Sequence, residues 1–389
     1  MKASFDFAAI PPLYFGAGKI AFLPSIAKSY GKKILLVRGG RSFDQSESRA
    51  AIFEQLAENG LDSGSCIIDR EPTPEMIDRA VNSFSTFNPD VVAGIGGGSV
   101  LDAAKAISAM LPLREPVKDY LEGVGTKTHP GTKVPFVAIP TTSGTGSEAT
   151  KNAVLSEVGR NGYKRSLRHS KFVPDAAIID PLLTLSCPPS VTAASGMDAF
   201  TQLLESYVST SANPETDALA LKGLELIKRS LLKAYAKPDD IPARTDMALA
   251  AYLSGITLAS AGLGLVHGFA SSIGGRFDVA HGVLCSRMMY ECNRTTVAKL
   301  RQEKNTMALE KYARVGELFC GEKDKKTDFY TDYLLEFIKD CTSWLDIPAL
   351  SRFGVLAGDI HEIAATTENK NNPVKINTDE IEEILAACL

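Results

Sequence analysis

The sequence predicts two domains, an α/β domain built on a parallel sheet and then an all-helical domain. The chain has 389 residues, which exceeds the usual size of a single hydrophobic core. Residues 1–185 alternate short apolar runs with helical stretches. Beyond the segment DPLLTLSCPPSVTAAS, long helical patterns dominate and strand candidates nearly vanish. We therefore expect an α/β domain over 1–185 and a helical domain over 186–389.

The elements of the first domain follow one another in strand–helix alternation. Buried strands are expected at residues 32–40 (KKILLVRGG), 65–70, 90–96, 134–142 and 175–180. Helical spacing occurs over residues 48–60 and again from residue 73 onward. Such alternation is typical of a doubly wound parallel sheet.

Composition and charge argue against several classes of binding partner and favour one cellular compartment. The formal net charge is −4 with both signs interspersed, so neither nucleic acid nor a membrane surface is expected as a partner. No apolar run is long enough to cross a bilayer, and the first residues lack the apolar core of a signal peptide. The seven cysteines are scattered without a CxxC pair, which favours a reduced, cytoplasmic protein.

A glycine-rich turn follows the strand at 90–96. In GIGGGSVLDAAKAIS, Gly97 and Gly98 allow close backbone approach, and the free amides of the following helix favour a phosphate. Ser99 is expected to cap this helix, with Asp102 completing a capping box. Alone, such a turn occurs equally well for structural reasons.

A second polar loop, PTTSGTGSEAT, follows the strand at 134–142. Thr141, Thr142 and Thr145 could contact a diphosphate or the ribose–nicotinamide part of a dinucleotide. Ligands of α/β sheets bind at the carboxyl ends of strands, where both loops are expected to lie. Together the two loops predict a nucleotide site.

The chain has five histidines, two of which lie in GLGLVHGFASSIGGRFDVAHGV. His267 and His281, with Asp198 on an upstream helical segment, would supply two imidazoles and one carboxylate. This set suits a divalent metal that keeps one position open for a substrate oxygen. Taken alone, histidines near glycine-rich turns more often serve packing or capping.

Five motifs in collinear order closely resemble the iron-containing (group III) alcohol dehydrogenases: GGGSVLDAAKAIS, PTTSGTGSEAT, DPLLTLSCPPSVTAASGMDA, AGLGLVHGFASSIGG and HGV. The resemblance implies a dehydroquinate synthase-like architecture with the active site between the domains. It also implies hydride transfer between NAD(P) and an alcohol or aldehyde, usually with Fe or Zn, in a dimer or larger homo-oligomer.

The resemblance places metal ligands at Asp198, His267 and His281, but it is incomplete at two positions. The family's third histidine ligand falls on Gln202, which shares a helix face with Asp198. A further histidine common in the family falls on Ser271. An amide is a weaker ligand than an imidazole, so Gln202 would be a weak ligand or bind substrate. A catalytic proton would then pass through Ser271, a ribose hydroxyl or water.

Three interpretations remain open. In the favoured one, Asp198, His267 and His281 hold a metal, as an Asp and two His do in the glycerol dehydrogenase branch. In the second, the enzyme needs no metal and resembles the maleylacetate reductase branch. In the third, the protein is catalytically silent and serves assembly.

The resemblance also places the cofactor. The adenosine ribose would lie near Gly39, Arg41 and Ser42, where no carboxylate excludes a 2′-phosphate, so both NAD and NADP are possible. Lys164 would approach the cofactor, and Leu182 in the DPLLT segment would contact it.

Substrate identity is the least determined property. Arg276 and Arg287 flank His281 in sequence and could hold an anionic group through their planar guanidinium. We therefore expect a short-chain alcohol or aldehyde as substrate, with a carboxylate, sulfonate or phosphonate tail as a narrower hypothesis.

Overall fold

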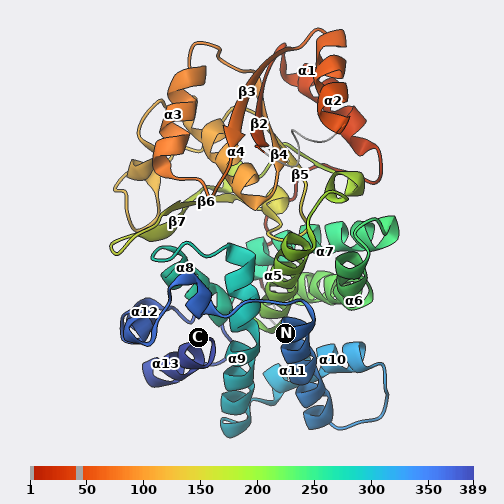
Figure 1. Ribbon diagram of the computed structural model, residues 1–389, viewed down its shortest axis with the longest axis vertical. Helices are drawn as coiled ribbons and strands as arrows, with labels where there is room; N and C mark the ends of the chain where they lie inside the picture. Colours follow the sequence, from red (N-terminus) through yellow and green to blue (C-terminus); the bar gives the residue numbers. More distant parts are fainter. Residues whose placement is uncertain (1–3, 41–46) are drawn as a thin grey trace.

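A computed structural model describes residues 4–40 and 47–389, and Figure 1 shows two stacked parts. The upper part contains the sheet and the lower part is helical. The last strand of the sheet ends at Ile179 and the first long helix of the lower part begins at Pro189. The predicted boundary at residues 185–186 falls between them.

The upper part is a six-stranded sheet in the order β1-β8-β5-β4-β2-β3, with every neighbouring pair parallel. Its strands are β1 (Leu13–Phe15), β2 (Lys33–Gly39), β3 (Asp62–Ile68), β4 (Val91–Gly96), β5 (Phe136–Pro140) and β8 (Ala176–Ile179). Its helices are α1 (Leu23–Tyr30), α2 (Glu47–Glu58), α3 (Pro74–Phe84) and α4 (Gly98–Met110). The predicted parallel α/β domain is therefore confirmed.

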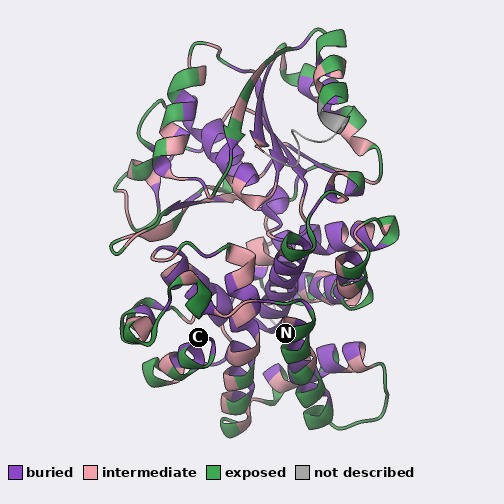
Figure 2. Ribbon diagram, viewed as in Figure 1, coloured by how far each residue is buried: buried purple, intermediate pink, exposed green. Residues whose placement is uncertain are grey.

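Successive residues of β2 enter different hydrophobic cores. Leu35 packs with α3 and α4, whereas Leu36 packs with α1 and α2. Because side chains alternate across a strand, a sheet covered on both faces needs a continuous apolar run. The sequence ILLV of β2 meets that need, and the strand is buried along most of its length (Figure 2).

An antiparallel hairpin lies beneath the sheet and was not predicted. It consists of β6 (Asn152–Glu157) and β7 (Tyr163–Arg168), and β7 packs against helix α8 (Leu265–Gly274) of the lower part. The basic run YKRSLR conceals the strand because only Leu167 of β7 is fully buried. The hairpin forms one wall between the two parts (Figure 1).

The predicted capping box at Ser99 is wrong. Helix α4 begins at Gly98 with Gly97 as N-cap and no side-chain cap. The Gly97 carbonyl already accepts the amides of Val100 and Leu101, so Ser99 lies inside the first turn. Asp102 is used elsewhere, where it accepts hydrogen bonds from Ser147 Oγ (2.5 Å) and the Val154 amide (3.0 Å).

The lower part is helical throughout its described length, as expected. Its helices are α5 (Pro189–Val208), α6 (Pro214–Ala236), α7 (Ile241–Ala261), α8, α9 (His281–Gln302), α10 (Thr306–Cys320), α11 (Thr327–Trp344), α12 (Ile360–Thr366) and α13 (Thr378–Ala387). Among the described residues no single helix is long and apolar enough for a membrane span, and only α7 and α8 together, bent by 95°, meet that test.

Two glycines bring the parts into direct backbone contact. Gly146, in the loop after β5, has a φ of +61°, which favours glycine. A Cβ on Gly146 would lie 2.5 Å from the Cα of Gly255 on α7. A Cβ on Gly255 would lie 2.2 Å from the Gly146 carbonyl oxygen. The loop that follows β5 is thereby pressed onto the helices that carry the lower half of the site.

Candidate active site

The structure brings the three predicted metal ligands together from three helices. Asp198 lies on α5, His267 on α8, and His281 is the first residue of α9. Asp198 Oδ1 is 3.4 Å from His267 Nε2 and 3.6 Å from His281 Nε2. The three donor atoms therefore point toward one small volume.

One oxygen of the carboxylate at the centre of this group lacks a hydrogen-bond partner among the described residues. Asp198 is 1% exposed, and its Oδ1 makes no hydrogen bond within residues 4–40 and 47–389. Burial by itself raises the pKa of Asp198, but the two neighbouring imidazoles outweigh it and leave that pKa below its ordinary value. A buried anionic oxygen without a donor is costly, and a cation at this point would satisfy it. The site thus fits a divalent metal.

A fourth donor, Cys285, was not predicted. Its Sγ lies 3.7 Å from Nε2 of both His267 and His281, and all four donor atoms lie within 4.8 Å of one another. Cys285 follows His281 by four residues on α9, so both side chains share one helix face. That spacing was visible in the sequence, but a cysteine without a CxxC partner is more often a small core residue.

A second missed residue, Glu205, orients His267. Its carboxylate lies 2.7 Å from His267 Nδ1 and accepts the Val266 amide at 2.7 Å. Glu205 is 5% exposed. A carboxylate on the far ring nitrogen fixes the tautomer, which leaves Nε2 available as a ligand.

Gln202 and Ser271 both lie at the cleft, where other residues contact Gln202 Oε1 and the Ser271 hydroxyl. The Ser254 hydroxyl donates to Gln202 Oε1 at 2.9 Å. The Ser271 hydroxyl donates to the His267 carbonyl at 3.0 Å and accepts Lys370 Nζ at 3.2 Å. The roles of these two residues remain predictions.

A cleft of about 690 Å³ is lined by the hairpin, the start of α4 and the lower helices. The predicted residues that line it are Gly98, Ser99, Asp102, Thr145, Lys164, Gln202, His267, Ser271 and His281. Those that lie outside its lining are Gly39, Gly97, Thr141, Thr142, Leu182 and the buried Asp198. Arg41 and Ser42 lie outside the described residues.

Buried and half-buried cations hold the cleft walls in place. Lys105 of α4 is 1% exposed and donates to Ser147 Oγ, Thr150 Oγ1 and the Asn152 carbonyl at 2.9–3.1 Å. Burial lowers the pKa of Lys105 to about 8. Lys105 thereby connects the loop after β5 to the helix after β4. The sequence did not predict this role, because Lys105 lies within an apolar helical pattern. Lys164 is paired with Glu71 at 2.7 Å.

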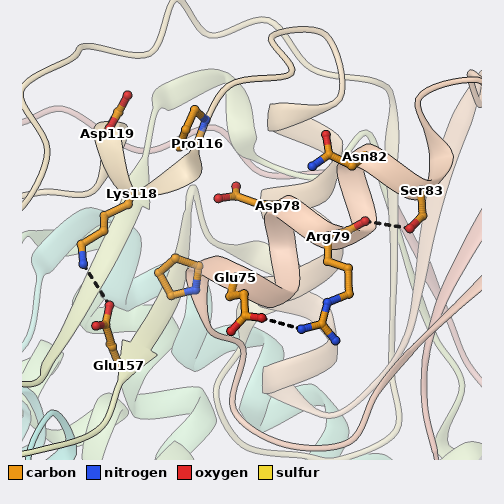
Figure 3. A pocket seen from close by; sticks show the side chains of 10 residues that line it. Glu75, Asp78, Arg79, Asn82, Ser83, Pro116, Lys118, Asp119 and Glu157 are labelled. Atoms are coloured by element: carbon orange, nitrogen blue, oxygen red, sulfur yellow. Dashed lines mark hydrogen bonds and ion pairs between the residues drawn. The ribbon is translucent and has the colours of Figure 1, made fainter.

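A second hollow lies on the surface beside α3 (Figure 3). Two ion pairs lie among its charged side chains: Arg79 pairs with Glu75 at 2.6 Å and Lys118 with Glu157 at 3.1 Å. None of the four converging donors lines it, so the chemistry belongs to the first cleft.

Comparison with known proteins gives a consistent result over the whole chain. Residues 11–181 match the family described as iron-containing alcohol dehydrogenase, and residues 192–389 match the C-terminal domain of the Fe-containing alcohol dehydrogenase family. Long-chain-alcohol dehydrogenase 1 of Geobacillus thermodenitrificans is 45% identical over 278 residues, which cover 70% of this chain and 69% of that protein.

Two further relatives extend the comparison. The NAD-dependent methanol dehydrogenase of Bacillus methanolicus is 34% identical over 314 residues, covering 79% of this chain and 78% of that protein. A crystal structure of 1,3-propanediol oxidoreductase superposes with a TM-score of 0.87 at 29% identity, covering 99% of this chain and 100% of that one. The family's enzymes are oxidoreductases that act on alcohols with NAD(P) and iron or another divalent metal. The chain therefore belongs to the iron-containing alcohol dehydrogenase family, as its motifs predicted.

Proposed function

We propose that this chain transfers hydride between NAD(P) and a short-chain alcohol or aldehyde, with a divalent metal held by Asp198, His267 and His281. The single observation that carries the proposal is the buried Asp198 Oδ1, which faces two imidazoles without a hydrogen-bond partner.

The metal, when bound, supplies Lewis-acid polarisation of the substrate oxygen. The protein residues would do the rest. His281 is the donor nearest solvent, with 25% of its side chain exposed, and it lines the cleft, so substrate is expected to approach from that side. Leu258, Ala259 and Ala270 form an apolar wall there. Such a wall excludes water from a transferring hydride.

The opposite wall is proposed to hold the dinucleotide. Gly98 and Ser99 at the start of α4 and Thr145 in the loop after β5 line it. Free amides at a helix start favour a diphosphate, and six cleft cations face four carboxylates, which suits an anionic ligand. The proposed cofactor is NAD or NADP; Arg41 and Ser42, which the resemblance places near its adenosine ribose, lie outside the described residues.

An anionic substrate tail would have to use Arg276 rather than Arg287. Arg276 lines the cleft, although it is paired with Glu362 at 2.8 Å. Arg287 donates to the Cys388 carbonyl at 3.1 Å and does not line the cleft. Exchange of Arg276 for Gln should raise KM for a carboxylated aldehyde while leaving KM for a neutral aldehyde of the same length unchanged. Equal effects on both substrates would remove the anionic-tail hypothesis.

The function is tested by elemental analysis of anaerobically purified protein together with NAD(P)H oxidation by a panel of small aldehydes, before and after chelation. We expect about one metal per chain, as in single-metal catalytic sites, and activity that the chelator abolishes. Undiminished turnover by metal-free protein would instead support the metal-independent reductase. Absence of both turnover and nicotinamide binding would support an assembly protein.

We further propose a cytoplasmic homodimer or larger homo-oligomer. All seven cysteines are free thiols, which suits a reducing compartment. Light scattering coupled to size-exclusion chromatography measures the assembly, and a monomer would refute it.

A further inference from the structure

We propose that Cys285 is a fourth metal ligand, whose thiolate takes the place left by Gln202 and makes this a Zn²⁺-selective Asp–His–His–Cys centre. The inference rests on the proposed function, since it concerns the same metal. It differs in substance from the predicted ligand set, which included Gln202 and no sulfur.

The distances among the donor atoms suit a four-ligand site. Ligand bonds of about 2.0–2.1 Å for N or O and about 2.3 Å for S give tetrahedron edges of roughly 3.3–3.6 Å. The carboxylate oxygen lies 3.4 and 3.6 Å from the two imidazole nitrogens, and the sulfur lies 3.7 Å from each of them. Cys285 therefore stands at a ligand's distance without any rearrangement of α9.

Gln202 is poorly suited to the role that its position suggests. An amide nitrogen only donates hydrogen bonds, so Oε1 alone could bind a cation. That oxygen lies 2.9 Å from the Ser254 hydroxyl, whose single proton is also within reach of the Ala251 carbonyl at 2.7 Å. Gln202 thus belongs to a buried α5–α7 contact, whereas Cys285 on the neighbouring helix α9 places its sulfur 3.7 Å from both imidazoles.

Charge balance supports the same assignment. Cys285 is 0% exposed and would lose its thiol proton to solvent when the metal binds. The thiolate and the Asp198 carboxylate then cancel the two positive charges of the metal in a site that water hardly reaches. A carboxylate with neutral ligands alone would leave a net positive charge there, which burial disfavours.

The thiolate also determines which metal is preferred. Sulfur ligands favour borderline-soft ions, and Zn²⁺ binds a given site more tightly than Fe²⁺. Four protein donors would close the site, except that His281 remains one-quarter exposed toward the cleft. Catalytic zinc sites sometimes expand to five ligands in the transition state, and such an expansion would give a substrate oxygen access beside His281.

The experiment is cobalt substitution. Metal-free protein receives one equivalent of Co²⁺, and its near-ultraviolet and visible absorption is recorded for the wild type, Cys285→Ser and Cys292→Ser. Cys292 is the matched control, because it lies on α9 two turns further along and is 2% exposed. We expect a thiolate-to-cobalt charge-transfer band in the wild type and in Cys292→Ser, and its loss in Cys285→Ser.

Affinity provides a second readout that does not depend on the band. Competition against a chromophoric chelator should show Zn²⁺ binding weakened by more than about 100-fold in Cys285→Ser, since loss of a supporting residue alone costs 10–100-fold. The double variant Gln202→His/Cys285→Ser should recover much of this affinity without recovering the charge-transfer band. That recovery would also show that the single variant is folded.

The outcomes separate the two proposals. Stoichiometric Co²⁺ binding to the wild type without a thiolate band overturns the Cys285 assignment and leaves the proposed metal-dependent function intact. A band that survives in Cys285→Ser also overturns it. Failure of the wild type to bind Co²⁺ or Zn²⁺ at all overturns both.

Discussion

The proposed metal centre and the proposed nucleotide wall, formed by Gly98, Ser99 and Thr145 of the same cleft, are built on opposite principles. The metal centre consists of side chains from α5, α8 and α9, and each atom there has a defined partner or donor role. The nucleotide wall owes its shape to residues without side chains, such as Gly98, where a Cβ would lie 2.6 Å from Thr145 Cγ2. We therefore expect metal binding to be lost when a side chain of the metal centre is removed, and cofactor binding to be weakened when a side chain is added to the nucleotide wall.

The largest effect should follow from neutralising the central carboxylate. Asp198→Asn keeps the shape and removes the charge, so metal should be lost and the rate of NAD(P)H oxidation should fall by about 10³-fold or more, the equivalent of several kcal/mol of Lewis-acid stabilisation. Elemental analysis and steady-state kinetics measure the two losses. Near-normal turnover in Asp198→Asn would contradict the proposed contrast between the two walls, because activity would then not depend on the metal centre.

Adding a side chain to the nucleotide wall should weaken cofactor binding and leave metal binding unchanged. Gly98→Val inserts bulk against Thr145, and overpacking of about 1–3 kcal/mol would weaken NAD(P)H binding by about 10- to 100-fold. Nicotinamide fluorescence measures this affinity. Metal content should stay at the wild-type level, and its loss would show that the two walls are not independent.

Removing the support of one ligand should have a moderate effect. Glu205→Gln replaces the carboxylate that fixes His267, so Zn²⁺ affinity should fall by about 10- to 100-fold with little change in NAD(P)H affinity. Chelator competition provides the measurement. Glu75→Gln on the surface of α3 is the control. An equal loss of Zn²⁺ affinity in this variant would show that Glu205 has no specific role in holding His267.

The smallest effect concerns pH. In metal-free protein, burial opposes protonation of His267, but nearby Cys285 and Glu205 outweigh it and raise the pKa of His267 well above 6.5. A raised folded-state pKa means that the stabilising proton is present at low pH and lost as pH rises through that pKa. Metal must displace this proton, so metal affinity should increase with pH by up to about tenfold per unit for each proton displaced. Isothermal titration calorimetry with Zn²⁺ at several pH values tests whether metal affinity increases with pH. A metal affinity that stays constant or decreases as pH rises would contradict the prediction.

The difference between the walls also explains what the sequence could reveal. Glycine loops after apolar strands are local patterns, and they predicted β4, β5 and the turns that follow them. Asp198, His267 and His281 were predicted from their residue types and from the order of the family motifs, and the structure brings their donor atoms together. Glu205 could not be found, because its role depends on how α5 packs against the start of α8.

Two other misses had local causes. The hairpin β6–β7 was missed because its basic residues hide a single buried leucine in β7. Ser99 was taken as a cap because serine commonly caps helices, whereas the chain uses the Gly97 backbone instead. Both errors concern places where backbone geometry overrides residue preference.

The backbone contact between Gly146 and Gly255 has a consequence for how such an enzyme can evolve. Neither glycine can gain a side chain without displacing the backbone of the other. Substitutions at these two positions therefore cannot gradually change the distance between the nucleotide wall and the helices of the lower part. Changes in substrate range must come instead from residues such as Leu258 and Ala259 on the apolar wall. Two residues without side chains thus restrict variation where the two parts meet, and we expect adaptation in the part of the cleft that is proposed to meet the substrate.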